Sequence, residues 1–408
     1  MEVTRNVAVV LSGGGMNGIL LELGFLQRLR GDERLWERVG WIYGTSAGAL
    51  AGVMAALDRL DELEEFLMEL RPEETFRPNR LWQLPFTGLH EYRLPETIAT
   101  RIAPADELVQ ALHAAPIELV VCVTDVGDEV GEGDDHAFER TFSSRTTPPE
   151  LMGQAVLASA AISALVLPVA VGDTIGTDGG WVRNFPLGHA YDNPDVEEIV
   201  AFRYRANYPR STAENLLRLR RRLERFRAVP PVRALIAELD AAEERRERGE
   251  PAHLPDMLMR LMRVTISRNT ALEERRATET DASMRELAAL RADVAEIAGR
   301  HALPWRRGRA AAEVDARFES TRFPFRHERL LPTVVVHGDA GDAALDPTFR
   351  AGLDWPGETK RALIARGYQL ADDALRAERE KGEGEAPASG TNGVPGPLVS
   401  SGGRQGGG

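Results

Sequence analysis

One stretch constrains the fold of this chain more than any other: Trp41–Leu50, WIYGTSAGAL. An apolar, aromatic run stops at Gly44, a serine follows two residues later, and a segment rich in Ala and Leu begins after Gly48. This order predicts a strand, a tight turn and a helix, as in an α/β protein. Gly-x-Ser-x-Gly at such a junction is the pattern of a nucleophile elbow, in which a serine is held exposed on a strained turn.

Ser46 is therefore a candidate nucleophile, and Gly44, Ala47 and Gly48 are the residues that would shape its turn. Glycines suit this place because they have no Cβ and let neighbouring backbone crowd the turn. The five-residue pattern alone also fits a simpler structure, a glycine-flanked helix start capped by Ser46 or Thr45. Other motifs in the chain are needed to decide between a nucleophile elbow and a capped helix start.

A second glycine-rich turn lies near the beginning of the chain. Val7–Leu11 is a continuous apolar run, which predicts a strand buried on both faces of a parallel sheet, and Ile19–Leu29 has apolar residues at helical spacing. A turn between them leaves several backbone N–H groups unpaired near the positive end of the helix dipole, so it favours negative charge. The residues of this turn that we single out are Gly13, Gly14, Gly15, Met16, Asn17 and Gly18.

The surrounding sequence indicates which kind of anion this turn would bind. The spacing formally satisfies the dinucleotide pattern G-x-G-x-x-G, but Asp32 and Glu33 lie in a polar turn rather than at the end of a second strand. No lysine followed by Ser or Thr is present, which excludes a P-loop. With a candidate nucleophile after the next strand, the turn is better interpreted as an oxyanion hole for acyl transfer. A turn that only lets helix and strand pack closely is the alternative.

Composition excludes several classes of function. The formal net charge of -13 over 408 residues argues against nucleic acid as the main partner. Cys122 is the single cysteine, so no internal disulfide can form, and its apolar neighbours predict a buried small side chain. No apolar stretch approaches the roughly 18 residues of a membrane span, and the first residues lead into a strand rather than a signal peptide. We expect a cytoplasmic protein whose membrane contact is peripheral and transient.

The pattern of the remaining chain indicates three parts. Apolar runs at 117–124, 166–171, 198–204 and 333–337 predict further strands, and 149–161 and 360–376 predict helices. From about Pro209 the sequence becomes rich in Arg and Glu at helical spacing, without a catalytic constellation. We expect a catalytic α/β domain over 5–208 and 330–376, a helical insertion over 209–329, and a disordered tail over 377–408.

Asp178 follows one of the predicted strands and precedes Gly179 and Gly180. The glycines would let its carboxylate approach a neighbouring loop closely. Asp-Gly is also the commonest hairpin turn signal, so Asp178 alone reads as a turn residue.

Three glycine-bearing motifs now follow predicted strands, in the order Gly13–Gly18, Gly44–Gly48 and Asp178–Gly180. In this the sequence resembles the patatin-like phospholipase family, whose motifs are G-G-G-x-[KR]-G, G-x-S-x-G and D-G-[AG]. The resemblance covers about residues 6–205 and resumes at 331–375. It implies a three-layer α/β/α fold with a central, mostly parallel sheet.

The resemblance also implies a serine–aspartate dyad without a histidine. Ser46 matches the nucleophile, Asp178 matches the proton acceptor, and the amides of Gly14, Gly15 and Met16 match the oxyanion hole. Asn17 departs from the family, which usually has Lys or Arg there, so the oxyanion would receive a hydrogen bond but no charge.

The expected function is that of a lipid acyl hydrolase, which cleaves carboxylic esters through an acyl-enzyme intermediate, with no cofactor and no metal. Two alternatives stay open. One is a triad of Ser46, Asp178 and His337, in the chain order of α/β-hydrolases, with His189 structural. The other is a regulatory lipid-binding protein with weak or no turnover. The head group, the acyl chain and the oligomeric state are left undetermined.

Overall fold

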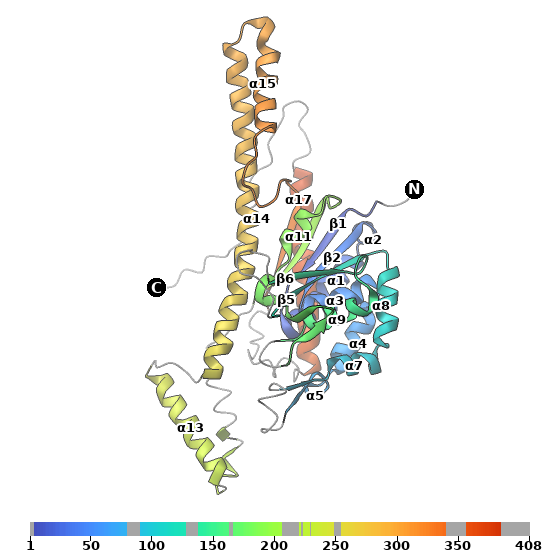
Figure 1. Cartoon of the computed structure of the whole chain (residues 1–408), viewed down its shortest axis with the longest axis vertical. Coiled ribbons are helices and arrows are strands. Elements are labelled where there is room, and N and C mark those ends of the chain that lie inside the picture. The colour runs from blue at the N-terminus through green and yellow to red at the C-terminus, as the bar shows by residue number, and fades with distance from the viewer. Residues whose placement is uncertain are drawn as a thin grey trace. The chain divides into compact units, whose positions relative to one another are not determined.

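A computed structural model describes residues 4–79, 90–127, 138–162, 166–205, 220–221, 223–228, 230–248, 254–339 and 356–384 (Figure 1). Its strands are β1 (Val7–Leu11), β2 (Val39–Thr45), β3 (Phe76–Pro78), β4 (His90–Tyr92), β5 (Glu118–Asp125), β6 (Glu139–Ser143), β7 (Val169–Val171), β8 (Thr174–Asp178), β9 (Glu198–Arg205) and β10 (Thr333–Asp339). Its helices are α1 (Gly15–Arg30), α2 (Glu33–Trp36), α3 (Ala47–Ala56), α4 (Leu60–Glu69), α5 (Pro72–Thr75), α7 (Leu94–Arg101), α8 (Ala105–Ala114), α9 (Pro149–Ser159), α10 (Gly180–Arg183), α11 (Leu187–Asp192), α13 (Pro230–Glu247), α14 (Leu254–His301), η1 (Pro304–Arg306), α15 (Arg307–Glu319) and α17 (Gly357–Gly384).

The central sheet is mostly parallel. Its strand order is β10-β9-β1-β2-β5-β8-β7, and β6 also pairs with β5. The pairs from β10 to β5 are parallel, whereas β6 and β8 run antiparallel to β5. The short strand β7 forms one edge, as the proline within its predicted run indicates. The carboxyl ends of β1 and β2 therefore lie together at one edge of the sheet, where sites of α/β proteins form.

Helices cover both faces of the sheet. Successive side chains of a strand point to opposite faces, so each strand contributes side chains to both layers. Val7, Val9 and Leu11 of β1 belong to a core cluster with buried side chains of α1, α3, α4, α9 and α17. Ala8 and Val10 are equally buried but lie outside that cluster, on the face where α11 packs against β1 and β2. The result is the three-layer α/β/α arrangement that the sequence predicted.

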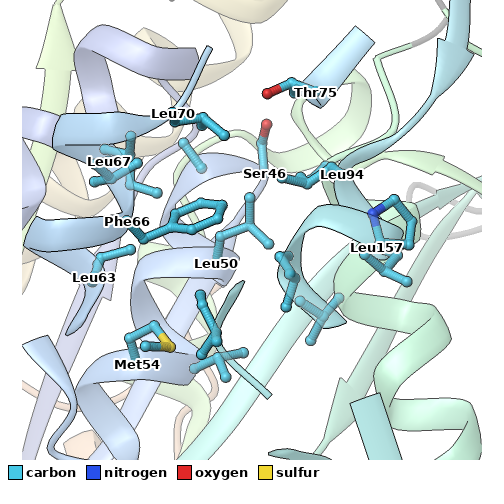
Figure 2. A pocket seen from close by; sticks show the side chains of 18 of the residues that line it. Ser46, Leu50, Met54, Leu63, Phe66, Leu67, Leu70, Thr75, Leu94 and Leu157 are labelled. Atoms are coloured by element: carbon cyan, nitrogen blue, oxygen red, sulfur yellow. The ribbon is translucent and has the colours of Figure 1, made fainter. Parts of the chain in front are cut away.

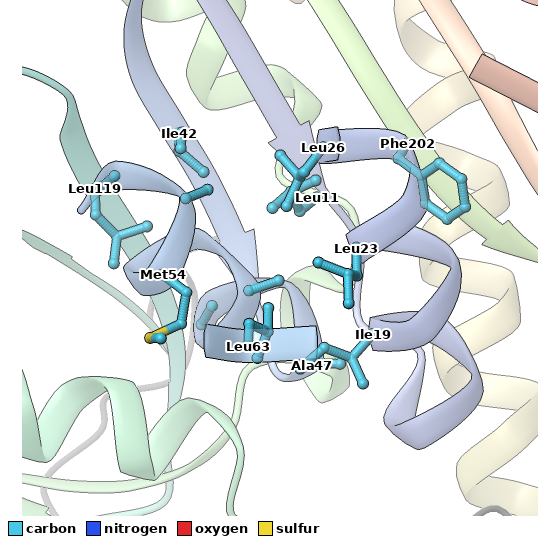
Figure 3. Close-up of a cluster of buried hydrophobic side chains, with 14 of the residues drawn as sticks. Leu11, Ile19, Leu23, Leu26, Ile42, Ala47, Met54, Leu63, Leu119 and Phe202 are labelled. Atoms are coloured by element: carbon cyan, nitrogen blue, oxygen red, sulfur yellow. The ribbon is translucent and has the colours of Figure 1, made fainter. Parts of the chain in front are cut away.

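The larger core cluster lies between the sheet and the helices α1, α3 and α4 (Figure 3). Leu11, Leu23 and Leu26 are completely buried there, and Ile42 and Leu119 bring neighbouring strands into the same cluster. Full burial of a leucine or isoleucine side chain stabilises a fold by roughly 1.5–3 kcal/mol, so this layer holds α1 and α3 firmly on the sheet. Both helices begin at the candidate site.

The chain divides into two compact units. Among the described residues, one unit contains the chain up to Glu273 and Leu331–Glu378, and the other contains Glu274–Leu330 and the end of the chain from Arg379. Helix α14 is continuous from Leu254 to His301 and so contributes its first part to the α/β unit. The helical insertion over 209–329 stays a prediction; within that range, Asn269, Thr270 and Glu273 bond to other residues of the α/β unit.

The predicted tail also starts later than expected. Helix α17 continues to Gly384, so residues 377–384 are helical, and residues 385–408 lie outside the described ones. The ion pair between Arg376 and Asp372, one turn apart, is of the kind that supports a helix exposed on its surface. No helix in the described part of the chain is both long enough and apolar enough to cross a membrane.

Helix α1 carries an unusual buried carboxyl, that of Glu22. The side chain has no exposed surface, and neither carboxyl oxygen has a hydrogen-bond partner among the described residues. Burial raises the pKa of Glu22 well above its ordinary value, because an apolar environment disfavours the charged form. The folded protein therefore retains a proton on Glu22 at pH values where the unfolded chain has released it.

We expect Glu22 to make the stability of the fold depend on pH. Its folded-state pKa is raised, so stability should be fully present below the unfolded value of about 4.3 and should decrease as the pH rises toward the folded value. Glu22→Gln cannot ionise and should remove this slope, so the variant should gain stability over the wild type between pH 5 and pH 8. Denaturant unfolding of both proteins across this range is the measurement. Parallel pH profiles would show that Glu22 does not titrate as described.

Candidate active site

Ser46 occupies a strained turn between β2 and α3. Its backbone angles are φ 55 and ψ -119, one of two positive φ values among the described non-glycine residues. Such a conformation costs roughly 1–3 kcal/mol and persists only where the surroundings impose it. A Cβ added to Gly48 would lie 2.7 Å from the carbonyl oxygen of Leu11, and one added to Gly44 would lie 2.5 Å from that of Gly48. The two glycines thus permit the close packing that the elbow pattern predicted.

Asp178 lies directly beside Ser46. The hydroxyl of Ser46 donates to Asp178 Oδ2 over 2.7 Å, although 132 residues separate them in the chain. Strand β5 brings them together, because Thr45 pairs with Cys122 and Asp178 pairs with Val123, the next residue of β5.

Burial and hydrogen bonds determine the pKa of the Asp178 carboxyl. Its other oxygen accepts from the amide of Gly180 over 2.7 Å, and the side chain is nearly fully buried. Burial raises the pKa of the Asp178 carboxyl to about 6, while the hydrogen bonds from Gly180 and Ser46 act in the opposite direction. A carboxylate with a pKa raised toward neutrality is a better match for taking a proton from a hydroxyl.

The glycine turn presents the start of α1 to the same place. The helix begins at Gly15, which has a φ of +57, and Gly14 is its N-cap. The amides of Gly14, Gly15, Met16 and Asn17 belong to the first turn, whose N–H groups have no acceptor within the helix. Gly15 and Met16 line the same cavity as Ser46. An oxygen that gains negative charge near Ser46 can thus lie close to first-turn amides and to the positive end of a helix dipole.

Two further polar residues hold this arrangement in place, and the sequence analysis assigned them no role. The hydroxyl of Ser159, at the end of α9, accepts from the amide of Ser46 over 2.9 Å and donates to the carbonyl of Cys122 over 2.7 Å. Asn184 accepts from the amide of Gly13 through its carbonyl and donates to the carbonyl of Gly13 through its side chain, over 2.9 and 3.2 Å. A serine among alanines and an asparagine after the Asp178 motif are the only signals in the sequence.

An ion-paired cluster supports α10, the short helix after Asp178. Arg183 donates to both oxygens of Glu139 over 2.5 and 2.9 Å and to Glu273 of α14 over 2.6 Å. His189 lies 2.6 Å from Glu139. Burial lowers the pKa of His189, but its hydrogen bonds to Cys122 and Glu139 outweigh this and raise the pKa to about 10. His189 is therefore a charged structural residue.

Three side chains of the same cluster are of types that can bind a metal ion. Cys122, Glu139 and His189 offer three potential ligand atoms within 4.8 Å of one another. Both oxygens of Glu139, however, already accept from the guanidinium of Arg183, and His189 is held in its protonated form. A cation would have to displace one positive charge and remove a proton from another, so the arrangement fits an ion-pair network and not a metal site.

An apolar cavity of about 170 Å³ opens at Ser46. Figure 2 shows Leu50 and Phe66 below Ser46 and Met54 farther from it. The lining comes from α1, α3, α4, α5, β3, α7, α8 and α9, and among the described residues that form it only Ser46 and Thr75 have hydroxyl-bearing or charged side chains. Since Ser46 and Met54 are eight residues apart along α3, the lining extends about 12 Å from the serine. The cavity suits an unbranched hydrocarbon group.

His337 does not belong to this site. It is part of β10, three strands away from β2 in the sheet, which is roughly 14 Å at the usual strand spacing. Burial and the nearby Arg205 and Arg203 lower the pKa of His337 to about 4. The triad that the chain order allowed is therefore not assembled in this structure, because chain order does not determine which strands become neighbours.

A buried serine on a strained turn, a buried carboxylate at the end of the antiparallel strand β8 and the amides of a helix start are the kinds of group that serine hydrolases use. The family model described as patatin-like phospholipase matches residues 9–191, so this segment of the chain is similar to that family. The match includes all three glycine motifs, and it confirms the resemblance that these motifs indicated.

Curated relatives and solved structures were compared as well. Two uncharacterized NTE family proteins, from Mycobacterium tuberculosis and Mycobacterium bovis, are each 28% identical over 202 residues, which is 48% of this chain and 30% of theirs. The alignment thus spans less than a third of these relatives. VipD from Legionella pneumophila covers 91% of this chain and 67% of its own with a TM-score of 0.34 and 13% identity. ExoU from Pseudomonas aeruginosa, in complex with SpcU, covers 92% and 74% with a TM-score of 0.27 and 15% identity.

Proposed function

We propose that this protein is a lipid acyl hydrolase that cleaves carboxylic esters with Ser46 as nucleophile and Asp178 as proton acceptor. The observation that carries the proposal is the 2.7 Å hydrogen bond between these two buried side chains at the mouth of an apolar cavity. A serine hydroxyl is a weak nucleophile on its own, and an adjacent base activates it. The match of residues 9–191 to the patatin-like phospholipase family supports the same chemistry.

The proposed reaction has two halves. Asp178 takes the proton of the Ser46 hydroxyl while Ser46 Oγ attacks the ester carbonyl, and the carbonyl oxygen becomes an oxyanion near the first-turn amides of α1. Asp178 returns this proton to the leaving alcohol, and the acyl group remains on Ser46. Water then attacks the acyl-enzyme and gives a proton to Asp178, which passes it to Ser46 Oγ as the fatty acid leaves, so the hydroxyl of Ser46 is restored.

The cavity supports a lipid as the source of the acyl group. Its lining is almost entirely apolar, so a hydrocarbon chain would gain about 0.8 kcal/mol for each methylene it buries. A short polar acyl group would gain little there. We therefore infer that the cavity holds the acyl chain and that the alcohol part of the ester lies outside it.

Two measurements test the proposal directly. A fluorophosphonate probe should label the purified protein, and peptide mass spectrometry should place the adduct on Ser46. Product analysis on mixed lipid bilayers should then show free fatty acid and the matching deacylated lipid. Lipid binding without any product and without labelling would instead indicate the regulatory lipid-binding alternative.

The pH dependence of the reaction provides a further prediction. Asp178 must be ionised to accept a proton, and its pKa is raised to about 6. We expect kcat/KM for a soluble ester to increase about tenfold per pH unit below pH 6 and to level off above it. Initial rates between pH 4 and pH 8 are the measurement, with protein stability monitored at each pH. A rate that is constant through this range would exclude Asp178 as the proton acceptor with this pKa.

A further inference from the structure

The second compact unit contains a helical hairpin with an unusual end. The part of α14 after Glu274 and the helix α15 run antiparallel, and Arg291 of α14 bonds to Asp315 and Glu319 of α15 over 2.6 and 3.0 Å. The turn between the two helices contains η1, the single 3-10 turn Pro304–Arg306. We call residues 297–312 the hairpin tip.

The hairpin tip exposes apolar side chains that a water-facing turn does not require. Trp305 is 76% exposed and Leu303 is 53% exposed. Ile297, at the start of the tip, is also exposed. Leaving a tryptophan in water forgoes the stabilisation that its large apolar surface provides when it is buried. Such a residue at the apex of a hairpin indicates a surface that is covered in some other state of the protein.

The charge of the hairpin tip is opposite to that of the chain as a whole. Between Glu296 and Glu313 there is no acidic residue, while Arg300, His301, Arg306, Arg307 and Arg309 are present, in a chain of net charge -13. Arg300 and Arg309 pair with Glu296 and Glu313 at the base of the tip. For Arg306 and Arg307, both exposed, no carboxylate partner exists in the described part of the chain. Two cations without a carboxylate partner in the described part of the chain thus directly follow Trp305.

We propose that the hairpin tip binds the surface of a membrane that contains anionic lipids, with Trp305 and Leu303 at the interface and Arg306 and Arg307 against the headgroups. Tryptophan favours the membrane–water interface because its ring is apolar and its N–H is polar. Arginines near an anionic surface add attraction that depends on ionic strength. A single basic or apolar element binds membranes weakly, and stable binding needs two such signals, both of which the tip offers.

Other occupants fit these features less well. Nucleic acid offers phosphates but no apolar interior, so its binding would leave the exposed Leu303 and Ile297 without apolar contacts. A second copy of this chain would bring the same cationic residues against each other, which opposes a symmetric contact through the tip. A negatively charged surface with an apolar interior matches both the charge and the apolar side chains.

The test is binding of the full chain to vesicles, in a Ser46→Ala background so that lipid is not consumed. Vesicles of phosphatidylcholine alone are compared with vesicles that contain an equal part of phosphatidylglycerol, by co-sedimentation at low and high salt. We expect binding to the anionic vesicles only, weaker at high salt. Arg306→Glu with Arg307→Glu should weaken it about 10- to 30-fold, and Trp305→Ser about 10-fold.

Matched variants elsewhere on the same unit serve as controls. Arg317→Glu with Arg322→Glu changes the charge equally at exposed positions, and Leu290→Ser removes an exposed apolar side chain, 52% exposed, from α14. These should retain wild-type binding within about twofold. Equal loss in controls and tip variants, equal binding to both vesicle types, or self-association that Trp305→Ser abolishes would each overturn the proposal. So would retention of nucleic acid in preference to anionic vesicles.

The outcome is independent of the proposed function. Hydrolysis of a soluble short-chain ester by the wild type reports on Ser46 and Asp178, and the tip variants should leave that rate unchanged. A chain that binds anionic vesicles through the tip but never hydrolyses esters would refute the hydrolase proposal alone. A chain that hydrolyses esters but fails the vesicle comparison would refute the tip proposal alone.

Discussion

Ser46→Ala is expected to reduce hydrolysis of long-chain carboxylic esters by at least about 10³-fold, because no other group at the site can form the acyl-enzyme. Asp178→Asn should reduce it by about 10²- to 10⁴-fold, since an amide cannot take the proton of the Ser46 hydroxyl. Each substitution is small, and the buried Asp178 carboxylate is costly to the fold, so neither variant should lose stability severely. Steady-state rates on p-nitrophenyl esters, with thermal unfolding of each variant, are the measurements.

His337→Ala is the matched control for this prediction. His337 lies in β10, away from Ser46, so its removal should leave kcat within about twofold. A large loss in His337→Ala, together with an active Asp178→Asn variant, would favour the triad and contradict the dyad. Full activity in Ser46→Ala would contradict both.

Leu50→Trp is expected to change which chain lengths the protein accepts. Leu50 lies one helical turn beyond Ser46 in α3 and lines the cavity (Figure 2). A tryptophan there would fill the path between the serine and Met54. If four methylenes of the acyl chain can no longer be buried in the cavity, about 3 kcal/mol of binding free energy is lost. The kcat/KM for long-chain esters should then decrease roughly 100-fold. An acetyl ester should be hydrolysed within about threefold of the wild-type rate.

The measurement is kcat/KM across a series of p-nitrophenyl esters of increasing acyl length. Val264→Trp, at a 63% exposed position of α14 outside the cavity lining, is the control for an added indole ring. Leu50→Ala should retain long-chain activity, because it opens the path rather than blocking it. A uniform decrease over all chain lengths in Leu50→Trp would show that the acyl chain does not use this cavity.

Much of the fold follows from local patterns. The continuous apolar runs at Val7–Leu11 and 117–124 predicted strands buried on both faces, and they are central strands of the sheet. Strand β7 lies in the predicted run 166–171, which contains Pro168, and it forms an edge of the sheet, where a residue without an N–H is tolerated. The division of α14 at Glu273 was not predictable, because the charged pattern of α14 is similar on both sides of it, and the bonds from Asn269, Thr270 and Glu273 to the rest of the α/β unit are tertiary contacts.

The residues that support the site could not be predicted from the sequence either, because their roles depend on contacts between distant segments. Ser159 and Asn184 have ordinary neighbours, and their importance comes from the carbonyls and amides that other segments place beside them. The same holds for Arg183 and Glu139, which are 44 residues apart and form an ion pair through tertiary contact. A hydrogen bond between distant segments leaves no periodic signal in the chain.

The sequence by itself determined the elements whose causes are local: the elbow at Ser46, the glycine turn before α1 and the chemical type of each candidate residue. Steric freedom of glycine and the period of apolar residues act over a few positions, so they can be read along the chain. Only the tertiary structure decided that Asp178 and not His337 meets Ser46, because that depends on which strands pair with β5. Strand pairing is set by the packing of the whole core, and no short stretch of sequence contains it.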